Sequence, residues 1–295
     1  MVTSAVVTPR ILAAMAVVAI ASVMVIYAPQ LGAYGAAPLA PTDAIAGGIN
    51  AGIKAFIGQF KPVLRFIAGG IDAGVRGVQS ALHSIPWLVA VTAVFVLGWR
   101  LKSLALGAGC ALAVLYMALS GHWVKSMNTL AMVGISVPLA LSFGFALGVL
   151  GAKSRRAHGV ILPTLDLMQT IPTFAYLAPL VVLFGFGPVP GVLASMIYAA
   201  PPITRNVMLG LRQVPQDLHE VAAMSGATPW QRFRFIELPH ARPQMLVGVN
   251  QSVLATLSMV IIAAVIGGFD DIGREVLVAT NKGSARVGQA LGAGV

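Results

Sequence analysis

Few side chains of this sequence stand in patterns that could carry out catalysis. No lysine follows a glycine anywhere in the chain, so the sequence has no phosphate-cradling G-x-x-x-x-G-K-[ST] loop. The histidines form no metal-ligand cluster, and Ser, His and Asp form no recognisable nucleophile motif. The five histidines lie apart, near the ends of apolar runs: His83, His122, His158, His219 and His240. We therefore expect a protein that is not an enzyme and that binds no metal or cofactor of its own.

The most informative polar segment is Glu220–Pro239, EVAAMSGATPWQRFRFIELP, which lies between two long apolar runs. Small residues around Ala222 favour a short helix that another surface can approach closely, and Gly226 is typical of the end of a helix. Thr228 and Pro229 are typical of the cap and the first position of a second helix. The pattern predicts a helix-turn-helix elbow onto which a separate motor protein docks.

The second helix of this elbow is expected to end at Pro239, before the chain enters the next apolar run. Its aromatic residues would form an apolar anchor, and its arginines would lie near lipid headgroups or an acidic partner. The side chains concerned are Trp230, Arg232, Phe233, Arg234 and Phe235.

The composition indicates a membrane protein. Hydrophobic residues make up 58% of the 295 residues, charged residues 9%, and the mean hydropathy is +0.87, whereas soluble domains are about 25% charged. The net charge of +10 comes from basic residues scattered between apolar runs, which favours the orientation of spans over nucleic-acid binding. Cys110, the single cysteine, forms no intrachain disulfide. We expect an all-α, polytopic membrane protein in a lipid bilayer.

Apolar runs near the ~20-residue length of a bilayer-crossing helix predict the spans. Six runs approach that length: Ile11–Ala28, Ser103–Ser120, Asn128–Leu150, Leu162–Phe184, Gly191–Gly210 and Met245–Gly267. A seventh, Ile85–Gly98, is shorter and spans only if its neighbours are recruited. The first run could be a signal peptide, but no clean cleavage site follows it, so we expect a retained anchor.

Basic residues in the short loops predict the orientation of the spans. The loops Gly121–Met127 and Gly185–Pro190 hold only Lys125. The opposite side is much richer and is therefore expected to be cytoplasmic, which places the elbow in the cytoplasm of a bacterial cell with the chain in its inner membrane. That side holds Arg10, Arg100, Lys102, Lys153, Arg155, Arg156, Arg205, Arg212, Arg232, Arg234 and Arg242.

Asp43–Ile85 has apolar residues at helical spacing and a polar opposite face, which predicts two amphipathic helices broken at Pro62. We favour a scaffold that braces the spans over a ligand site for this segment. The predicted domains are residues 1–84, an anchor plus scaffold helices, and residues 85–295, a transmembrane domain with the elbow at about 214–240.

Leu162–Phe184 differs from the other spans because it contains Pro163, Pro172 and Pro179. Each proline removes a backbone hydrogen bond, and in hydrocarbon such breaks are tolerated where they face protein or a water-lined cavity. We place this span along a translocation pathway, although a kinked helix packed on its neighbours explains any single residue equally well. The candidate pathway residues are Gln169, Thr170, Pro172, Thr173, Tyr176 and, in the last span, Asn250. Several aromatics could line the passage or simply pack: Phe174, Tyr176, Phe184, Phe186 and Tyr198.

Asp166 is the only carboxylate inside a predicted span, one turn from its cytoplasmic end. We expect it to form a structural ion pair with Arg155 or Arg156. Ion-coupled carriers need titratable or ion-coordinating groups at mid-depth, so their scarcity argues against secondary transport.

The elbow resembles the EAA coupling motif of ABC importer permeases, E-A-A-x3-G-x9-I-x-L-P. Six positions are in register, with Val221 replacing an alanine: Glu220, Ala222, Gly226, Ile236, Leu238 and Pro239. Four further stretches resemble the permeases for glycine betaine, proline betaine and choline: Asp166–Tyr176, Phe184–Gly191, Ala200–Ile203 and Gly248–Leu254. The resemblance covers roughly residues 85–277.

This resemblance implies the transmembrane fold of a type I ABC importer and a set of partners. A homodimer of permease subunits would form the pathway, a cytoplasmic ABC ATPase would hydrolyse ATP and receive each elbow, and an extracytoplasmic substrate-binding protein would deliver the cargo. Glycine betaine, proline betaine, choline and carnitine cannot be ranked from the sequence.

Two alternatives remain beside an ATP-driven importer: an ion-coupled carrier or channel, and a non-transporting, degenerate permease scaffold. Family members carry a further span after Asp270–Leu291, and Ala290–Val295 resembles its beginning. We therefore expect either a truncated sequence or a protein that lacks the last span of the transport core.

Overall fold

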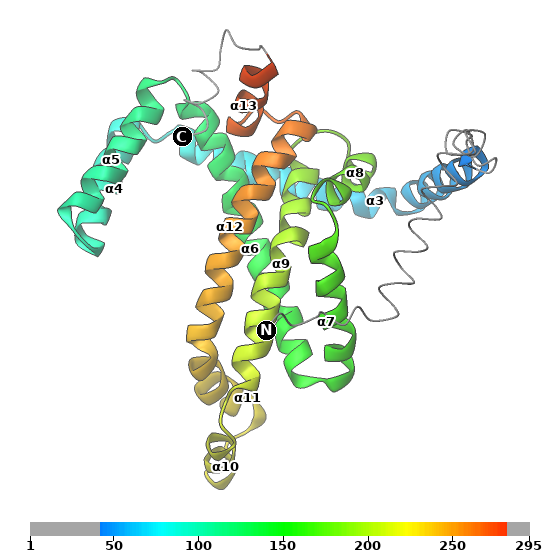
Figure 1. Ribbon diagram of the computed structural model, residues 1–295, viewed down its shortest axis with the longest axis vertical. Coiled ribbons are helices and arrows are strands. Elements are labelled where there is room, and N and C mark those ends of the chain that lie inside the picture. Colours follow the sequence, from blue (N-terminus) through cyan, green and yellow to red (C-terminus); the bar gives the residue numbers. More distant parts are fainter. Residues whose placement is uncertain (1–41, 282–295) are drawn as a thin grey trace, which may run out of the picture. The chain divides into compact units, whose positions relative to one another are not determined.

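A computed structural model describes residues 42–281, and every regular element in that range is helical (Figure 1). This confirms the expected all-α class. The elements are α3 (Thr42–His83), α4 (Trp87–Leu101), α5 (Leu104–Leu119), α6 (Trp123–Lys153), α7 (Arg155–Thr170), α8 (Phe174–Phe184), α9 (Pro188–Arg212), α10 (Gln216–Met224), α11 (Pro229–Arg232), the π-helix η1 (Phe233–Glu237), α12 (Leu238–Gly267) and α13 (Ile272–Asn281).

The described residues belong to two compact units, whose boundary lies between Lys61 and Pro62. That boundary is inside α3, which is assigned as one helix through Pro62, so the prediction of two helices broken there is wrong. A proline has a backbone φ close to the helical value and removes a single hydrogen bond, which a long helix can accommodate. The predicted domain division at residue 84 stays a prediction. The predicted anchor Ile11–Ala28 and the segment Ala290–Val295 lie outside the described residues.

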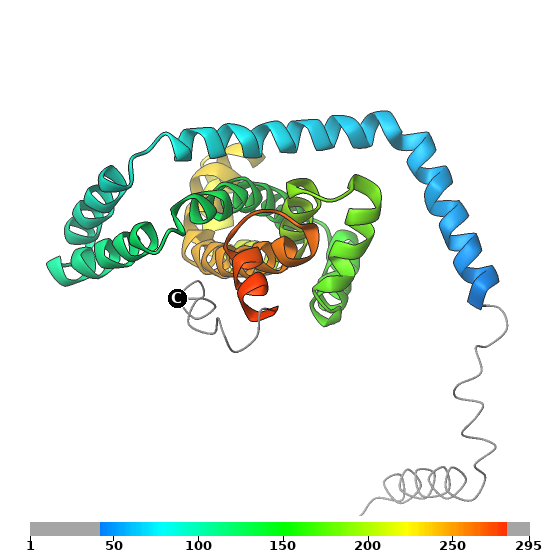
Figure 2. The same cartoon turned by 90° about the horizontal axis from the view of Figure 1, so that it is seen from above.

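Three long helices, α6, α9 and α12, form the bundle on which the rest of the larger unit is built (Figure 2). Small residues recur every four positions on the buried face of α6: Ser136, Ala140, Gly144 and Gly148. A Cβ atom on Gly148 would lie 2.6 Å from Cβ of Val207, so α6 and α9 touch almost backbone to backbone. Helices in lipid associate through such close packing, because the surrounding hydrocarbon gives them no hydrophobic reason to meet.

The same close contacts fix the direction of each helix. Gly191 near the start of α9 faces Met132 near the start of α6, so these two helices run parallel. In α12, Gly248 faces Asn206, and Ala263 faces Gly191, so α12 runs antiparallel to both. Two parallel helices need a return segment between them, and α7 with α8 supplies it.

Two of the described helical stretches, Trp123–Lys153 and Pro229–Gly267, are long and apolar enough to cross a membrane. The count rises to four if each bent pair of helices is one span: Ala51–His83 with Trp87–Leu101, and Arg155–Thr170 with Phe174–Phe184. The predicted spans Asn128–Leu150 and Met245–Gly267 lie inside the first two. The predicted span Gly191–Gly210 lies in α9, which is 25 residues long and includes Pro201 and Pro202. α9 is not among the described helices that are apolar enough to cross a membrane by length and composition.

The predicted spans Ile85–Gly98 and Ser103–Ser120 correspond to α4 and α5, which pair as a hairpin. Gly98 and Gly107 make the contact: a Cβ atom on Gly107 would lie 2.5 Å from the carbonyl oxygen of Phe95. The two helices have 15 and 16 residues, so each is shorter than the ~20 residues that cross a bilayer.

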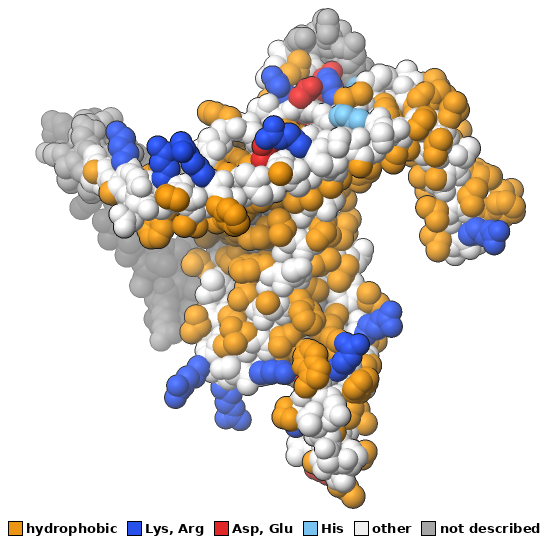
Figure 3. All heavy atoms as spheres, turned by 180° about the vertical axis from the view of Figure 1, so that it is seen from behind, with side chains coloured by type: hydrophobic (Ala, Val, Ile, Leu, Met, Phe, Trp, Pro, Cys, Tyr) orange, Lys and Arg blue, Asp and Glu red, His pale blue; other side chains and the backbone are white. Residues whose placement is uncertain are grey.

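Basic side chains gather at one end of the bundle, where α10 and α11 also lie, and apolar side chains cover the surface beyond it (Figures 1 and 3). Lys153 ends α6, Arg155 begins α7 and Arg212 ends α9, so three chain segments bring charge to the same end. This arrangement agrees with the orientation inferred from the loops.

The close approach of α6 and α9 predicts a specific sensitivity to added volume. Gly148→Ala places a methyl group against Val207 and should lower the free energy of unfolding by about 1–3 kcal/mol. Gly109→Ala in α5 is the matched control, because its Cβ meets nothing within 4 Å and alanine is the better helix former by about 1 kcal/mol. Thermal unfolding of the detergent-solubilised protein measures both. Equal stability of the two variants would contradict this account of the bundle.

Candidate coupling elbow and translocation pathway

The first arm of the elbow is α10, and a glycine closes it as the sequence predicts. Gly226 has φ +68°, a left-handed conformation that favours glycine. The Gly226 N–H donates to the carbonyl of Ala223 at 3.1 Å, and the Ala227 N–H donates to that of Ala222 at 3.0 Å. This pair of bonds is the Schellman motif, which satisfies the last carbonyls of a helix and reverses the chain.

The second arm starts with the predicted cap. The Thr228 hydroxyl accepts from the Gln231 N–H at 3.3 Å, and the Gln231 side chain accepts from the Thr228 N–H at 2.8 Å. Pro229 occupies the first helical turn. This capping box fixes the angle at which the second helix leaves the turn, so two short residue patterns make the elbow rigid.

The prediction that Pro239 ends the second helix is wrong. Helical structure continues from Pro229 to Gly267, through α11, η1 and α12. In η1 the Leu238 N–H donates to the carbonyl of Phe233, five residues back. Pro239 has no N–H to donate, and a π turn directly before it absorbs the irregularity as a local widening of the helix.

The aromatic anchor is only partly as predicted. Phe233 is 7% exposed and packs in the core with Val207 and Leu211, under the Lys153 ammonium at 4.2 Å from the ring centroid. Trp230 and Phe235 remain exposed. Together with the exposed Val221 and the 89% exposed Met224 of α10, they give the elbow an apolar outer surface.

Glu237 is a structural residue of the elbow that the sequence reading missed. It is 8% exposed and accepts from Nε of Arg232 at 2.9 Å, and Nδ1 of His219 lies 3.8 Å from the same oxygen. The Arg232 contact lies within the second arm, whereas the approach of His219 brings α10 next to it. The sequence does hold a sign of this role: Glu237 is an acidic residue in the otherwise apolar FIELP stretch, and it follows Arg232 by about one and a half helical turns.

The six EAA-motif positions all lie in this elbow, in different environments. Glu220, Gly226 and Pro239 are exposed, Ala222 is buried, and Ile236 and Leu238 are half-buried. Leu238 packs on the core beside Phe233. The exposed positions are available to a partner and the buried ones hold the elbow on the bundle, but their coupling role stays a prediction.

The proline-rich span is broken, not merely kinked. α7 ends at Thr170, α8 begins at Phe174, and the two helices are bent by 97° at the break. Pro172 lacks the N–H that would donate to the carbonyl of Met168, four residues back. The Tyr176 hydroxyl donates to that carbonyl instead. The Met168 carbonyl, which the proline leaves without its helical donor, is therefore hydrogen-bonded, as a backbone acceptor inside a bilayer has to be.

A cavity of about 270 Å³ lies at this break. Of the candidate pathway residues, Gln169 and Tyr176 line it, while Thr170, Pro172 and Thr173 belong to the break without lining the cavity. Asn250 is exposed on α12 and does not line the cavity. The remaining walls are Met168, Tyr198, Pro201, Pro202 and Ala255, so α9 and α12 complete the site. Its role in transport stays a prediction.

Asp166 forms the expected ion pair, but its partner is Arg205 of α9. Arg155 and Arg156 are about ten residues away on α7, which is roughly 15 Å along a helix. A neighbouring helix offers a closer cation, which the sequence alone does not reveal. The pair ties α7 to α9 on the cytoplasmic side of the cavity.

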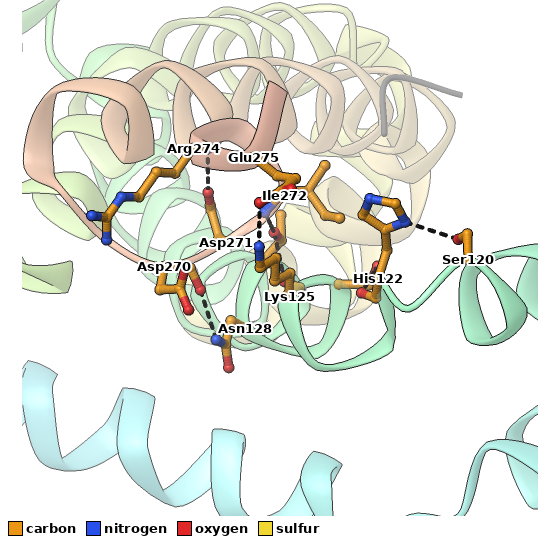
Figure 4. Close-up of polar contacts among 11 residues, drawn as sticks. Ser120, His122, Lys125, Asn128, Asp270, Asp271, Ile272, Arg274 and Glu275 are labelled. Carbon is orange, nitrogen blue, oxygen red and sulfur yellow. Dashed lines mark hydrogen bonds and ion pairs between the residues drawn. The ribbon is translucent and has the colours of Figure 1, made fainter. Parts of the chain in front are cut away.

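At the opposite end of the bundle, polar contacts hold α13 against α6 (Figure 4). Lys125 pairs with Glu275, the Asn128 side chain donates to the carbonyl of Asp270 at 2.7 Å, and Thr129 accepts from the Ile272 N–H at 3.2 Å. A larger cavity of about 460 Å³ opens beside these contacts, between α5, α6 and α12. Its walls are mostly apolar, so we do not assign cargo to it.

Broken and unbroken apolar helices, a basic end and a rigid polar elbow define this chain as a multi-pass membrane permease. Residues 144–294 match the family described as "Binding-protein-dependent transport system inner membrane component", and the chain belongs to that family. It is thus an ABC importer permease of the inner membrane, a transport subunit and not an enzyme. Permeases of this family work with an ATPase and a binding protein.

Named relatives are similar over most of the chain. The glycine betaine/proline betaine permease ProW of Escherichia coli is 36% identical, over 81% of this chain and 68% of its own length. The glycine betaine permease OpuAB of Bacillus subtilis is 36% identical over 77% and 80%. The glycine betaine/carnitine permease GbuB of Listeria monocytogenes is 37% identical over 86% and 91%.

Asp271, in the turn just before α13, predicts a pH dependence of stability. Burial raises the pKa of Asp271 to about 6 from 3.8, although its carboxylate accepts from the Arg274 N–H at 3.1 Å, and nearby Asp270 raises it further. Because the folded-state pKa is the higher one, this contribution to stability is complete below pH ~4 and is lost as the pH rises through ~6.

Asp271→Asn keeps an oxygen acceptor for Arg274 and removes the titration. The variant should be more stable than wild type at pH ~8, by up to about 3 kcal/mol, and equally stable at pH ~4. Lys125, Glu275 and His122 are unchanged in both proteins, so the difference isolates Asp271. Thermal unfolding in detergent at the two pH values measures it, and identical pH profiles would show the assignment to be wrong.

Proposed function

We propose that this chain imports quaternary ammonium osmolytes, such as glycine betaine, proline betaine or choline, as a homodimer driven by a separate ABC ATPase. The ATPase binds and hydrolyses ATP, and this chain holds no nucleotide. An extracytoplasmic binding protein delivers the cargo. The ATPase docks on the elbow, and the broken span α7–α8 lies along the translocation pathway.

The elbow is the observation that carries this proposal. It is closed by a Schellman motif and a capping box, lies at the basic end of the bundle, and exposes Met224, Trp230 and Phe235 to solvent. Apolar side chains on a rigid polar element are unfavourable unless a partner covers them. A cytoplasmic ATPase with a groove for the elbow provides that cover.

The charges of the described spans favour an external motor over ion coupling. Asp166 is compensated by Arg205, and the cavity at the break is lined by no ionisable carboxylate, lysine or arginine among its described walls. A carrier coupled to protons or sodium needs such groups at mid-depth. The energy for transport therefore has to come through a partner.

A second copy of the chain is supported by one face of α12. Leu246, Leu254 and Ile261 are 56%, 58% and 41% exposed and recur at helical spacing. Asn250 lies in the same stripe and is exposed too. An amide in contact with lipid is costly, whereas a facing helix or a shared water-lined passage can satisfy it. A homodimer that places its passage along α12 removes this cost.

The class of cargo is proposed from the relatives, whose names give glycine betaine, proline betaine and carnitine. All three contain a quaternary nitrogen, a cation with no N–H to donate. The described walls of the cavity contain aromatic rings and no carboxylate, which suits such a cation better than it suits a primary amine.

Two changes at the elbow test the coupling. Glu220→Arg reverses an exposed charge, and Gly226→Asp adds a charged side chain where a Cβ meets nothing within 4 Å but where the left-handed φ of +68° also strains the turn. Both should weaken co-purification of the ATPase and lower ATP-dependent uptake of radiolabelled glycine betaine in proteoliposomes by about tenfold or more, as expected for loss of an interface hot spot.

Lys102→Glu, an exposed charge reversal between α4 and α5, is the control and should leave both measurements unchanged. Uptake that persists without ATP and requires an ion gradient would favour a carrier or channel. A protein that neither retains an ATPase nor transports would favour a degenerate scaffold.

A further inference from the structure

The cavity at the break of α7–α8 is built around two tyrosines. Tyr176 of α8 and Tyr198 of α9 stand with ring centroids 6.3 Å apart and planes inclined at 62°. Both line the cavity of about 270 Å³, together with Gln169 of α7 and Ala255 of α12. The volume is close to the ~300 Å³ at which small-molecule pockets begin, so one compact group fits and a bulky ligand does not.

The position of Tyr176 is set by the break itself. Its hydroxyl donates to the Met168 carbonyl, to which Pro172 cannot donate because proline has no backbone N–H. This bond holds the Tyr176 ring against the end of α7. In an uninterrupted helix, residue 176 would lie about two turns further along the axis than residue 168. The edge-to-face contact with Tyr198 then holds both rings in place. Proline and tyrosine together therefore create an aromatic corner in the middle of a span.

The electrostatics of the corner favour a particular kind of cation. The described lining residues carry no ionised side chain, and Asp166 of α7 and Arg205 of α9 compensate each other in an ion pair. An ammonium group with N–H donors would find only neutral acceptors among these walls, such as the Gln169 amide and the tyrosine hydroxyls, and no carboxylate to balance its charge. A trimethylammonium group has no donors to satisfy, and its positive charge is attracted by ring faces.

We propose that Tyr176 and Tyr198 form a transient subsite for the quaternary ammonium group of the cargo within the permease. The site recognises a fully alkylated nitrogen by cation–π attraction, so the permease itself discriminates between cargoes after the binding protein has released them. The Asp166–Arg205 pair lies on the cytoplasmic side: Arg205 follows Pro201 by four residues on the same face of α9, and Asp166 precedes Gln169 by three. This inference rests on the proposed function and adds a site to it.

Substitutions at Tyr198 test the site in the complete transporter, with ATPase and binding protein in proteoliposomes. Tyr198→Phe keeps the ring and should transport glycine betaine within about twofold of wild type. Tyr198→Leu removes the ring and should lower the uptake rate by about 3- to 30-fold, the range expected for a desolvated cation–π contact. Tyr198 makes no side-chain hydrogen bond that either change would break among the described contacts, so folding should be retained.

Changing the electron density of the ring at position 198 without changing its shape distinguishes cation–π recognition from packing. Phenylalanine analogues with increasing numbers of ring fluorine atoms at position 198 keep the shape and weaken the negative ring face. Uptake should fall stepwise along this series. Choline and its neutral isostere 3,3-dimethylbutanol give the matched ligand pair: choline should compete with glycine betaine for binding to the permease–ATPase complex without binding protein, and the isostere should not.

The outcomes distinguish this site from the proposed function. If wild type shows no ATP-dependent uptake of any quaternary ammonium compound, the proposed function fails. If wild type transports and Tyr198→Leu matches it, or if fluorination has no effect, only the subsite is overturned. Equal losses in Tyr198→Phe and Tyr198→Leu would also overturn it, because they would assign the effect to the hydroxyl.

Discussion

The close packing of small residues between α6, α9 and α12 is the constraint on which the rest of the structure depends. In lipid, no hydrophobic effect drives apolar helices together, so van der Waals contact between near-bare backbones has to do so. Gly144 and Gly148 of α6 and Gly248 of α12 all press on α9, at Ile203, Val207 and Asn206. Once these contacts set the spacing and direction of the three helices, the return segment α7–α8 and the elbow have fixed end points.

The need to satisfy backbone hydrogen bonds then decides how each proline is accommodated. At Pro172 the helix breaks, and a tyrosine hydroxyl takes over the acceptor that proline leaves free. At Pro239 the helix continues, and a π turn widens it just before the proline. The first site lies beside a cavity and can bend, whereas the second packs on the core through Leu238 and cannot. Tertiary surroundings, more than the proline itself, select between break and bulge.

The sequence predicted those features that depend on neighbours in the chain. The Schellman turn at Gly226 and the capping box at Thr228 follow from residues within a few positions of each other, so the turn between the two arms of the elbow was predictable. Two wrong predictions, at Pro62 and Pro239, concern how a helix accommodates a proline, and the other differences involve contacts between distant segments. Phe233 is buried because α9 lies beside it, Asp166 pairs with Arg205 because α9 is nearer than the start of α7, and Glu237 matters because His219 and Arg232 converge on it. The aromatic corner required both kinds of information: the prolines marked the break, but only the fold brought Tyr198 to Tyr176.

The continuity of helical structure from Pro229 to Gly267 gives the proposed coupling a physical route. Because the second arm of the elbow is not separated from α12 by a loop, a force on Trp230 or Phe235 acts directly on the end of a hydrogen-bonded rod. Near its start, Gln244 of α12 donates to Asn206 of α9 at 2.6 Å, and further along, Ala255 forms a wall of the cavity beside Tyr176 and Tyr198. A tilt of α12 would therefore change the shape of the cavity without any intermediate loop having to transmit it. Had Pro239 ended the helix, as the sequence alone suggested, a flexible joint would have separated the motor from the pathway, and the π turn is what avoids that joint.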